Sequence, residues 1–369
     1  MEDTERILED LRELVIRESP SDDPVRVSEL AAWIRERLNR IGAPIARTVP
    51  CPPRGDAVVA TIGSEGDGRP KTLLLGHIDT VWPVGTIDEL PFQREGDVLR
   101  GPGVFDMKAG VAVAMNVLDR LRGLPSAPCV TLLLVPDEEV GSAASSELLI
   151  ELARKHDRVL VLEPSAKGGA AKVARKGTGL FHVRFTGIPS HAGLDPEKGA
   201  SALKALAEFV LDTPRFASVE AGTTVTATVA SAGTKTNVVP EHAEVVLDCR
   251  VWEASEPARV EAALRSFRPQ DTRVKVDVQG GFDRPPLTET DQSRALFANA
   301  QGAATALGFE LRGERVGGAS DGNLTAAAGV PTLDGLGPQG DGAHARHEHV
   351  LISDVARRAA FIERLVLGS

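Results

Sequence analysis

The stretch TLLLGHID, residues 72–79, is a short apolar run followed at once by a histidine and an aspartate. Polar residues bound the run, so its length and composition predict a buried β-strand that ends near His77. Similar apolar runs lie at 57–62, 129–135 and 158–162, and acidic residues follow the last two. The sequence therefore predicts several buried strands with chemically active residues at or beyond their carboxyl ends.

Helical patterns alternate with these strands. Apolar residues have helical spacing at about 3–18 and 24–41, and the small-residue stretch Gly110–Arg122 predicts a well-packed helix. Strands that alternate with helices predict a mostly parallel sheet. Ligands of such sheets bind beyond the carboxyl ends of the strands, which is where the acidic and histidine residues stand.

The pattern changes near Ala174. Residues 181–185 alternate between apolar and polar side chains, as expected for a strand with one solvent-exposed face. The following segments predict the order β-α-β-β-α-β, which is typical of a ferredoxin-like α+β domain. Its expected helices lie at 199–211 and about 256–267, and its further strands at 222–231, 243–251 and 273–279.

After Pro285 the chain returns to its first pattern. We expect a helix at 291–306, a glycine-rich turn, another helix and a last short strand. The predicted fold is therefore an α/β domain of residues 1–174 and 286–369, interrupted by an α+β domain of residues 175–285.

Composition excludes several classes of function. The formal net charge is -10, which argues against nucleic acid or an anionic membrane as the main partner. The first residues lack the pattern of a signal peptide, and no apolar run reaches the ~20 residues of a membrane helix. Three widely spaced cysteines fit a reducing cytoplasm and offer no thiolate zinc site. Any metal must then be held by His, Asp and Glu.

His77 and Asp79 are the first candidates for such a site. In an extended segment their side chains point the same way, so the carboxylate can orient the imidazole. A solvated loop histidine is an equal alternative. Asp106, in GPGVFDMKAG (101–110), opens a predicted helix, and on its own this position favours an N-cap.

Three consecutive acids, Asp137, Glu138 and Glu139, follow the run 129–135. Crowding them beside apolar residues is costly unless a cation lies nearby, although a solvated acidic turn remains an alternative. Neighbours on an extended backbone diverge, so one can bind metal while the next faces substrate.

The remaining candidates stand at the end of another strand and near the carboxyl terminus. Glu163 ends the strand predicted at 158–162. His344, His347 and His349 share a glycine-rich loop, and their spacing alone does not choose among them.

These segments together resemble one family over essentially the whole chain, in order. The family is that of the co-catalytic zinc exopeptidases and deacylases, which includes acetylornithine deacetylase, succinyl-diaminopimelate desuccinylase and aminoacylase. The resemblance is strongest to its bacterial folate-cleaving glutamate carboxypeptidases. The matching motifs are GHIDTVWPVGT, EGDVLRGPGVFDMKAG, PDEEVGS, EPS, SHAGLDPEKGASA, TNVVPEHAEVVLDCR, GGASDGN and the H-x-x-x-E of 344–348.

The resemblance implies a metal ligand set. His77 and Glu163 would bind one Zn²⁺, Glu139 and His344 the other, and Asp106 would bridge both. His344 is chosen over the other loop histidines because the family's ligand stands four residues before a glutamate, here Glu348. Two Zn²⁺ per subunit are expected, with Co²⁺ or Mn²⁺ as substitutes.

The resemblance also implies the catalytic parts. Glu138 would be the general base for a metal-activated water, Asp79 would orient His77, and His191 would help stabilise the oxyanion. The interrupting domain would be the family's dimerisation or lid domain, so a homodimer is expected by analogy.

A further implied group would hold the substrate carboxylate. Two Zn²⁺, three carboxylates and a hydroxide are together near neutral, so a separate cation is needed, and Arg250 suits a bidentate grip. Asn237 matches a position that reads the same carboxylate. Gly318 could offer its backbone N–H, although a plain turn before a helix capped by Ser320 or Asp321 is an equal alternative.

The expected function is thus metallo-exopeptidase chemistry of the carboxypeptidase type. The substrate would be an N-acyl amino acid or peptide with a free carboxylate, and glutamate the residue released. An N-acyl amino acid deacylase or a dipeptidase of the same family is the second reading. A non-catalytic binding protein is the third, disfavoured because every ligand and Glu138 are present. His156 and His182 are expected to be structural.

Overall fold

The computed structural model describes residues 2–40, 45–63, 68–124 and 126–368 and divides them into two compact units. The main unit comprises residues up to Ala174 with 289–316 and from Ser320 onward; the insert unit comprises 175–288 with 317–319. The sequence placed the second boundary at 285. The observed one lies at 288, because Leu287 pairs with Arg175 through two backbone hydrogen bonds of 3.0 Å.

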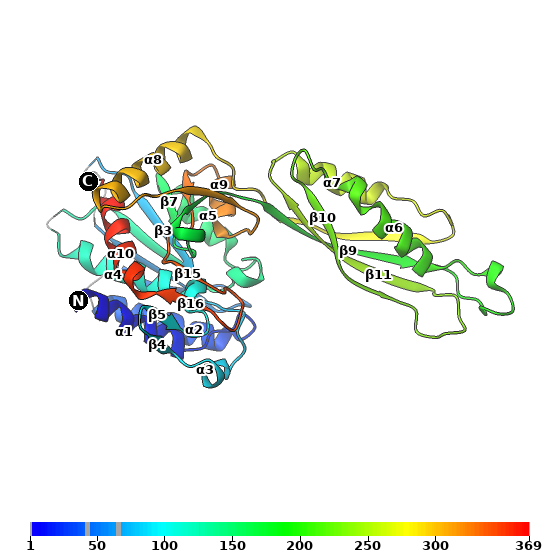
Figure 1. The fold of residues 1–369 in the computed structure, drawn as a ribbon, viewed down its shortest axis with the longest axis horizontal. Coiled ribbons are helices and arrows are strands. Elements are labelled where there is room, and N and C mark those ends of the chain that lie inside the picture. Colours follow the sequence, from blue (N-terminus) through cyan, green and yellow to red (C-terminus); the bar gives the residue numbers. More distant parts are fainter. Residues whose placement is uncertain (1, 41–44, 64–67, 125, 369) are drawn as a thin grey trace. The chain divides into compact units, whose positions relative to one another are not determined.

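The main unit is built on a six-stranded sheet (Figure 1). The strands β6, β3, β7 and β14 are parallel to one another, whereas β1 and β2 continue the sheet antiparallel at one edge. The predicted mostly parallel sheet is confirmed. In sheet order the strands are β1 (Ile45–Pro50), β2 (Asp56–Ile62), β6 (Val130–Val135), β3 (Thr72–His77), β7 (Arg158–Val161) and β14 (Thr332–Leu333).

Both faces of this sheet are covered. Leu74, Leu132 and Leu160 belong to one apolar cluster, and their neighbours Leu75 and Leu133 belong to another. Burial on both faces explains why these strands read as continuous apolar runs rather than alternating ones. The covering helices are α1 (Glu2–Ile16), α2 (Pro24–Arg40), α4 (Ala109–Arg122), α5 (Ser146–Arg154), α8 (Asp291–Ala306), α9 (Asp321–Ala327) and α10 (Ile352–Leu367).

The end of the chain differs from expectation. The sequence predicted a last short strand, but the chain ends in helix α10, and the short strands β14, β15 and β16 precede it. Val355, Ala359, Ile362 and Val366 are buried at helical spacing, so the signal was present. Within the described residues α10 packs against α4 and α8.

Small elements complete the main unit. A second four-stranded sheet has the order β15 (Gly340–Asp341), β16 (His349–Leu351), β5 (Val98–Arg100) and β4 (Gln93–Glu95). Strands β8 (Ala171–Arg175) and β13 (Gly313–Val316) form a two-stranded ribbon, and α3 (Thr86–Glu89) is a single turn. Every helix in the described part of the chain is too short or too polar to cross a membrane.

The insert unit has its own sheet and core. Its antiparallel strands lie in the order β10 (Thr224–Ala232), β11 (His242–Val251), β9 (Gly177–Thr186) and β12 (Lys275–Arg284), with helices α6 (Ala202–Phe216) and α7 (Glu256–Ser266). This connectivity is the predicted β-α-β-β-α-β order. Along β9, Phe181 and Phe185 are buried and His182 is exposed, so the one-sided strand is confirmed.

Two glycines give a matched test of this packing. A Cβ on Gly110, in α4, would lie 2.1 Å from the carbonyl oxygen of Leu162, whereas one on Gly302, in α8, meets nothing within 4 Å. We expect Gly110→Ala to lower the free energy of unfolding by about 1–3 kcal/mol through overpacking. Gly302→Ala should raise it by about 0.4–1 kcal/mol, because alanine restricts the unfolded chain. Urea denaturation followed by circular dichroism measures both, and equal stabilities would contradict the close helix–strand contact.

Candidate metal centre

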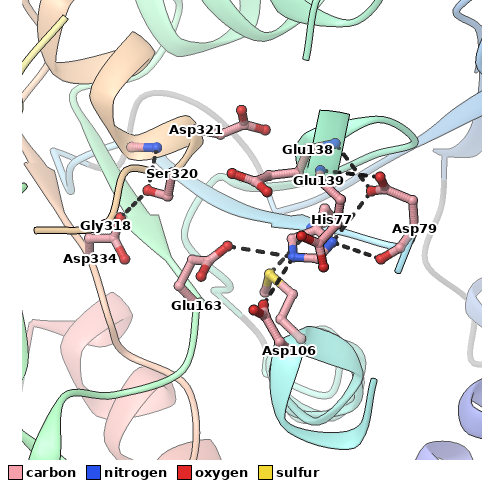
Figure 2. Close-up of polar contacts among 12 residues, drawn as sticks. His77, Asp79, Asp106, Glu138, Glu139, Glu163, Gly318, Ser320, Asp321 and Asp334 are labelled. Atoms are coloured by element: carbon pink, nitrogen blue, oxygen red, sulfur yellow. Dashed lines mark hydrogen bonds and ion pairs between the residues drawn. The ribbon is translucent and has the colours of Figure 1, made fainter. Parts of the chain in front are cut away.

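The candidate ligands gather at the carboxyl ends of three parallel strands. His77 is the last residue of β3, Glu139 follows β6 on the 3-10 turn Glu138–Val140, and Glu163 lies just beyond β7. Because neighbouring parallel strands end at the same edge, residues distant in sequence come together there. Figure 2 shows their side chains converging.

His77 faces two carboxylates. Its Nε2 lies 3.3 Å from Asp106 Oδ1 and 3.5 Å from Glu163 Oε1, and the ring is buried. Its Nδ1 is 3.0 Å from the main-chain oxygen of Asp79 and 3.4 Å from Asp79 Oδ1. Burial alone would lower the pKa of His77, but hydrogen bonds to Asp106 and Asp79 raise it well above its usual value.

His344 makes the corresponding contacts on the other side. Its Nε2 lies 3.1 Å from Glu139 Oε2 and 3.4 Å from Asp106 Oδ2. Hydrogen bonds to Asp106 and Glu139 raise the pKa of His344 to about 10. In the same loop, His349 Nδ1 instead hydrogen-bonds the main-chain oxygen of His347. The structure therefore brings His344 to the carboxylates, as the family spacing implied.

Asp106 lies between the two histidines and offers one carboxylate oxygen to each. Burial acts to raise its pKa, but His344 and His77 hold it well below its usual value. The N-cap alternative is wrong: the N-cap of helix α4 is Lys108, two residues after Asp106, and it makes no side-chain cap hydrogen bond.

This geometry can be tested against a metal. Zinc with tetrahedral N and O ligands at 2.0–2.2 Å requires ligand atoms about 3.3 Å apart. The four His–carboxylate distances above span 3.1–3.5 Å, and the candidate ligands form two groups that share Asp106. In the described part of the chain, Glu139 Oε1 is buried without a hydrogen-bond partner. The residues present fit a two-metal site built from N and O donors.

Asp79 also supports the turn that carries Glu138 and Glu139. Its buried carboxylate accepts hydrogen bonds from the backbone N–H of Glu138 (3.1 Å) and of Glu139 (3.2 Å), and from Ser21 Oγ (2.7 Å). The nearest contact of Asp79 to His77 is its main-chain oxygen rather than its carboxylate. Sequence reasoning missed Ser21, because it lies 58 positions from Asp79.

The first acid of the triplet, Asp137, holds the loop that follows β6. Asp137 is buried, and its carboxylate accepts hydrogen bonds from the backbone N–H of Ala144 (2.8 Å) and from Ser145 Oγ (2.5 Å). These bonds close the loop that follows β6. Asp137 therefore has a different environment from Glu139, whose carboxylate lies against His344.

In the insert unit, His191 and Asn237 come from paired segments. The main-chain oxygen of Asn237 accepts a 2.9 Å hydrogen bond from Ala192 N, and His191 bridges to Val238. His191 is exposed, and its Nδ1 accepts hydrogen bonds from Gly193 N and Leu194 N, both 3.1 Å. Because Nδ1 is the acceptor, the neutral ring carries its proton on Nε2.

The other two candidates in this unit already have partners. Arg250 donates from Nε and Nη2 to the carboxylate of Asp248, at 2.8 and 2.7 Å, which occupies one edge of its guanidinium fork. The carbonyl oxygen of Gly318 accepts a 3.1 Å hydrogen bond from Arg175 Nη1. Two positions further on, Ser320 is the N-cap of α9 and accepts from Gly322 N at 3.0 Å.

The two histidines expected to be structural have no place in the cluster. His156 bonds the carbonyl oxygen of Leu152 (2.7 Å) and Thr131 Oγ1 (2.9 Å), and thus links α5 to β6. His182 lies on the exposed face of β9.

Comparisons with known proteins show what the chain is similar to. The chain is 31% identical to carboxypeptidase G2 of Pseudomonas sp. (strain RS-16), over 98% of this chain and 88% of that protein. It is 28% identical to a succinyl-diaminopimelate desuccinylase of Methylobacterium sp. (strain 4-46), over 94% and 92%. Its fold is that of the aminopeptidase PepT of Bacillus cereus ATCC 10987, with a TM-score of 0.85, 21% identity and coverage of 99% and 98%.

The family model described as "Peptidase family M20/M25/M40" matches residues 73–368, a range that contains all five candidate ligands and Glu138. This match covers most of the chain, and the 31% identical relative is covered over most of its length. The chain therefore belongs to peptidase family M20/M25/M40 and is a metal-dependent hydrolase.

Proposed function

We propose that this protein is a two-zinc carboxypeptidase that hydrolyses the amide bond to a C-terminal amino acid, with glutamate as the residue released. The observation that carries the proposal is the position of Asp106, which offers one oxygen to each of two histidine–glutamate pairs. A single carboxylate shared in this way suits two metal ions rather than one.

Each metal would have its own ligands. His77 and Glu163 would hold one zinc, Glu139 and His344 the other, and Asp106 both. When bound, zinc acts as a Lewis acid that polarises the substrate carbonyl and makes water acidic enough to deprotonate near neutral pH. Histidine and carboxylate donors suit zinc, and Co²⁺ or Mn²⁺ could substitute.

Glu138 would move the proton. It directly precedes Glu139, and the carboxylate of Asp79 accepts hydrogen bonds from the backbone N–H groups of both residues. Both side chains therefore extend from one turn whose backbone is fixed. As general base, Glu138 would take a proton from the attacking water and deliver it to the leaving amine. The role of Asp79 would be to fix this turn as well as His77.

Residues of the insert unit would recognise the substrate. His191, whose Nε2–H is free of the backbone contacts made by Nδ1, would donate to the developing oxyanion, from the same chain or from a second copy. Asn237 and Arg250 would bind the free carboxylate, for which the near-neutral metal centre offers little attraction. Since Asp248 occupies the Nε–Nη2 edge of Arg250, the carboxylate would use Nη1 or displace Asp248.

The choice of substrate rests on similarity. The motifs resemble those of bacterial glutamate carboxypeptidases, and carboxypeptidase G2 is 31% identical. The 28% identity to a desuccinylase supports N-acyl amino acid deacylation as the second candidate.

A substrate panel separates these candidates. Initial rates of amine release by the zinc-loaded enzyme would be measured on folate, N-benzoyl-glutamate, N-acetyl-ornithine, N-succinyl-diaminopimelate and simple dipeptides. We expect chelator-sensitive release of glutamate from the first two. Activity confined to the other substrates would keep the metal mechanism and refute glutamate, whereas chelator-resistant activity would refute the metal mechanism.

A further inference from the structure

Glu348 is a buried carboxylate that accepts four hydrogen bonds. Its Oε1 accepts from the backbone N–H of Phe105 (2.9 Å) and Asp106 (3.0 Å). Its Oε2 accepts from Gly103 N (2.9 Å) and from Trp82 Nε1 (2.7 Å). All four partners are N–H donors, so the site requires two acceptor oxygens and has no place for a carboxyl proton. Glu348 is 3% exposed, which makes each lost partner costly.

The three backbone donors belong to the segment that carries Asp106. This segment runs from Gly103, which has φ 69°, to Lys108 and departs from helical angles at Asp106 and Met107. Backbone N–H groups before and in the first turn of a helix have no intrahelical partner, and buried N–H groups need one. The side chain of Glu348 is the partner of these N–H groups at Gly103, Phe105 and Asp106.

The far end of the same segment is also fixed. Lys108 is 2% exposed, and its Nζ donates to the carbonyl oxygens of Leu14 (2.9 Å) and Arg17 (3.0 Å), at the end of α1. With Lys108 held by α1, the remaining freedom of Asp106 is restricted by Glu348.

Glu348 also belongs to the loop of His344. The backbone bonds from Ala345 N to Gly342 O (2.8 Å) and from Glu348 N to Ala345 O (2.9 Å) tighten this loop, in which His344 has φ 61°. A non-glycine residue with positive φ costs free energy and persists only where its surroundings hold it. One carboxylate thus joins the loop of His344 to the backbone of Asp106.

We propose that Glu348 is a positioning residue that sets the spacing between Asp106 and His344 and thereby the affinity for metal. The inference rests on the proposed two-metal site. It predicts that loss of Glu348 weakens binding at both metal positions, because Asp106 would serve both. Partners that orient metal ligands typically change metal affinity by about 10–100-fold when they are removed.

A graded set of variants tests this. Glu348→Gln keeps one acceptor oxygen but turns an amide NH₂ toward two N–H donors. Glu348→Asp keeps the charge with a shorter reach, and Trp82→Phe removes one bond of the four. Glu89→Gln is the matched control, because Glu89 bonds Arg346 of the same loop (3.1 Å) on the exposed surface. Zinc dissociation constants of the metal-free proteins would be measured by chelator competition, together with the unfolding midpoint and amide hydrogen exchange at 103–106.

We expect Glu348→Gln to bind both zinc ions about 10–100-fold more weakly than wild type, with faster exchange at 103–106. Glu348→Asp and Trp82→Phe should lie between it and wild type, and Glu89→Gln should match wild type. A Glu348→Gln protein that is less stable yet binds both ions with wild-type affinity overturns the inference and leaves the metal centre intact. Failure of the wild-type protein to bind two zinc ions overturns the metal centre itself.

Discussion

Glu138→Gln should retain both zinc ions and lose almost all turnover. The substitution keeps the size of the side chain but removes the only group proposed to accept a proton from water and return it to the leaving amine. General acid–base groups contribute about 10²–10⁴-fold, so kcat should fall by at least that factor. The Asp79 contacts to the turn use backbone N–H groups and should survive. Metal content by atomic absorption and kcat on the best substrate of the panel measure the two effects.

Glu139→Gln is the matched control, since it removes the same charge one residue away. Glu139 Oε2 lies 3.1 Å from His344 Nε2, so its loss should reduce bound metal as well as rate. The Glu138→Gln and Glu139→Gln variants should therefore differ in bound metal, although both lose activity. A Glu138→Gln enzyme with wild-type kcat would show that another group is the base, and loss of metal from it would show that the two roles are interchanged.

Removal of metal should lower the melting temperature as well as abolish activity. Asp106 lies close to Glu163 in one candidate ligand group and to Glu139 in the other, and a cation bound in either group would stabilise only the folded state. A ligand present at a thousand times its dissociation constant contributes about 4 kcal/mol. For a protein of this size that corresponds to a shift of roughly 5–10 °C. Differential scanning calorimetry with and without chelator, at constant pH, measures it.

The melting temperature of the main unit should be the one that falls, because all five proposed ligands lie in that unit and the insert unit has a separate core. Chelator already saturated with zinc is the control for effects of the chelator itself. Re-addition of zinc should restore both the melting temperature and the activity. An unchanged or higher melting temperature without metal would be inconsistent with a folded two-metal site.

The sequence predicted the strands and much of the site because their signals are local. Apolar runs mark β3, β6 and β7, and polar residues at their ends mark the edge where His77 and Glu163 lie. The helical spacing of the first two helices and the alternation in β9 are likewise local patterns. Each pattern follows from which positions of one strand or helix are buried, so a short stretch of sequence is enough to read it.

Contacts between distant segments were less predictable. The N-cap that the position of Asp106 favoured on its own is absent, because Lys108 caps α4, and the backbone N–H of Asp106 instead donates to Glu348, 242 positions away. Spacing alone left three loop histidines open, and only the family pattern selected His344. The final helix was missed although its apolar spacing is regular, and a last short strand was expected in its place.

Tryptophan placement gives the molecule an optical property. The sequence has three tryptophans and no tyrosine, so indole rings dominate its ultraviolet emission. Trp33 lies under the guanidinium of Arg17, Trp252 near the ammonium of Lys176, and Trp82 donates its ring N–H to Glu348. Trp82 is thus hydrogen-bonded to the carboxylate that holds the Asp106 backbone. If the proposed metal site fills, we expect the fluorescence of Trp82 to change, because the same carboxylate binds its ring N–H and the Asp106 backbone.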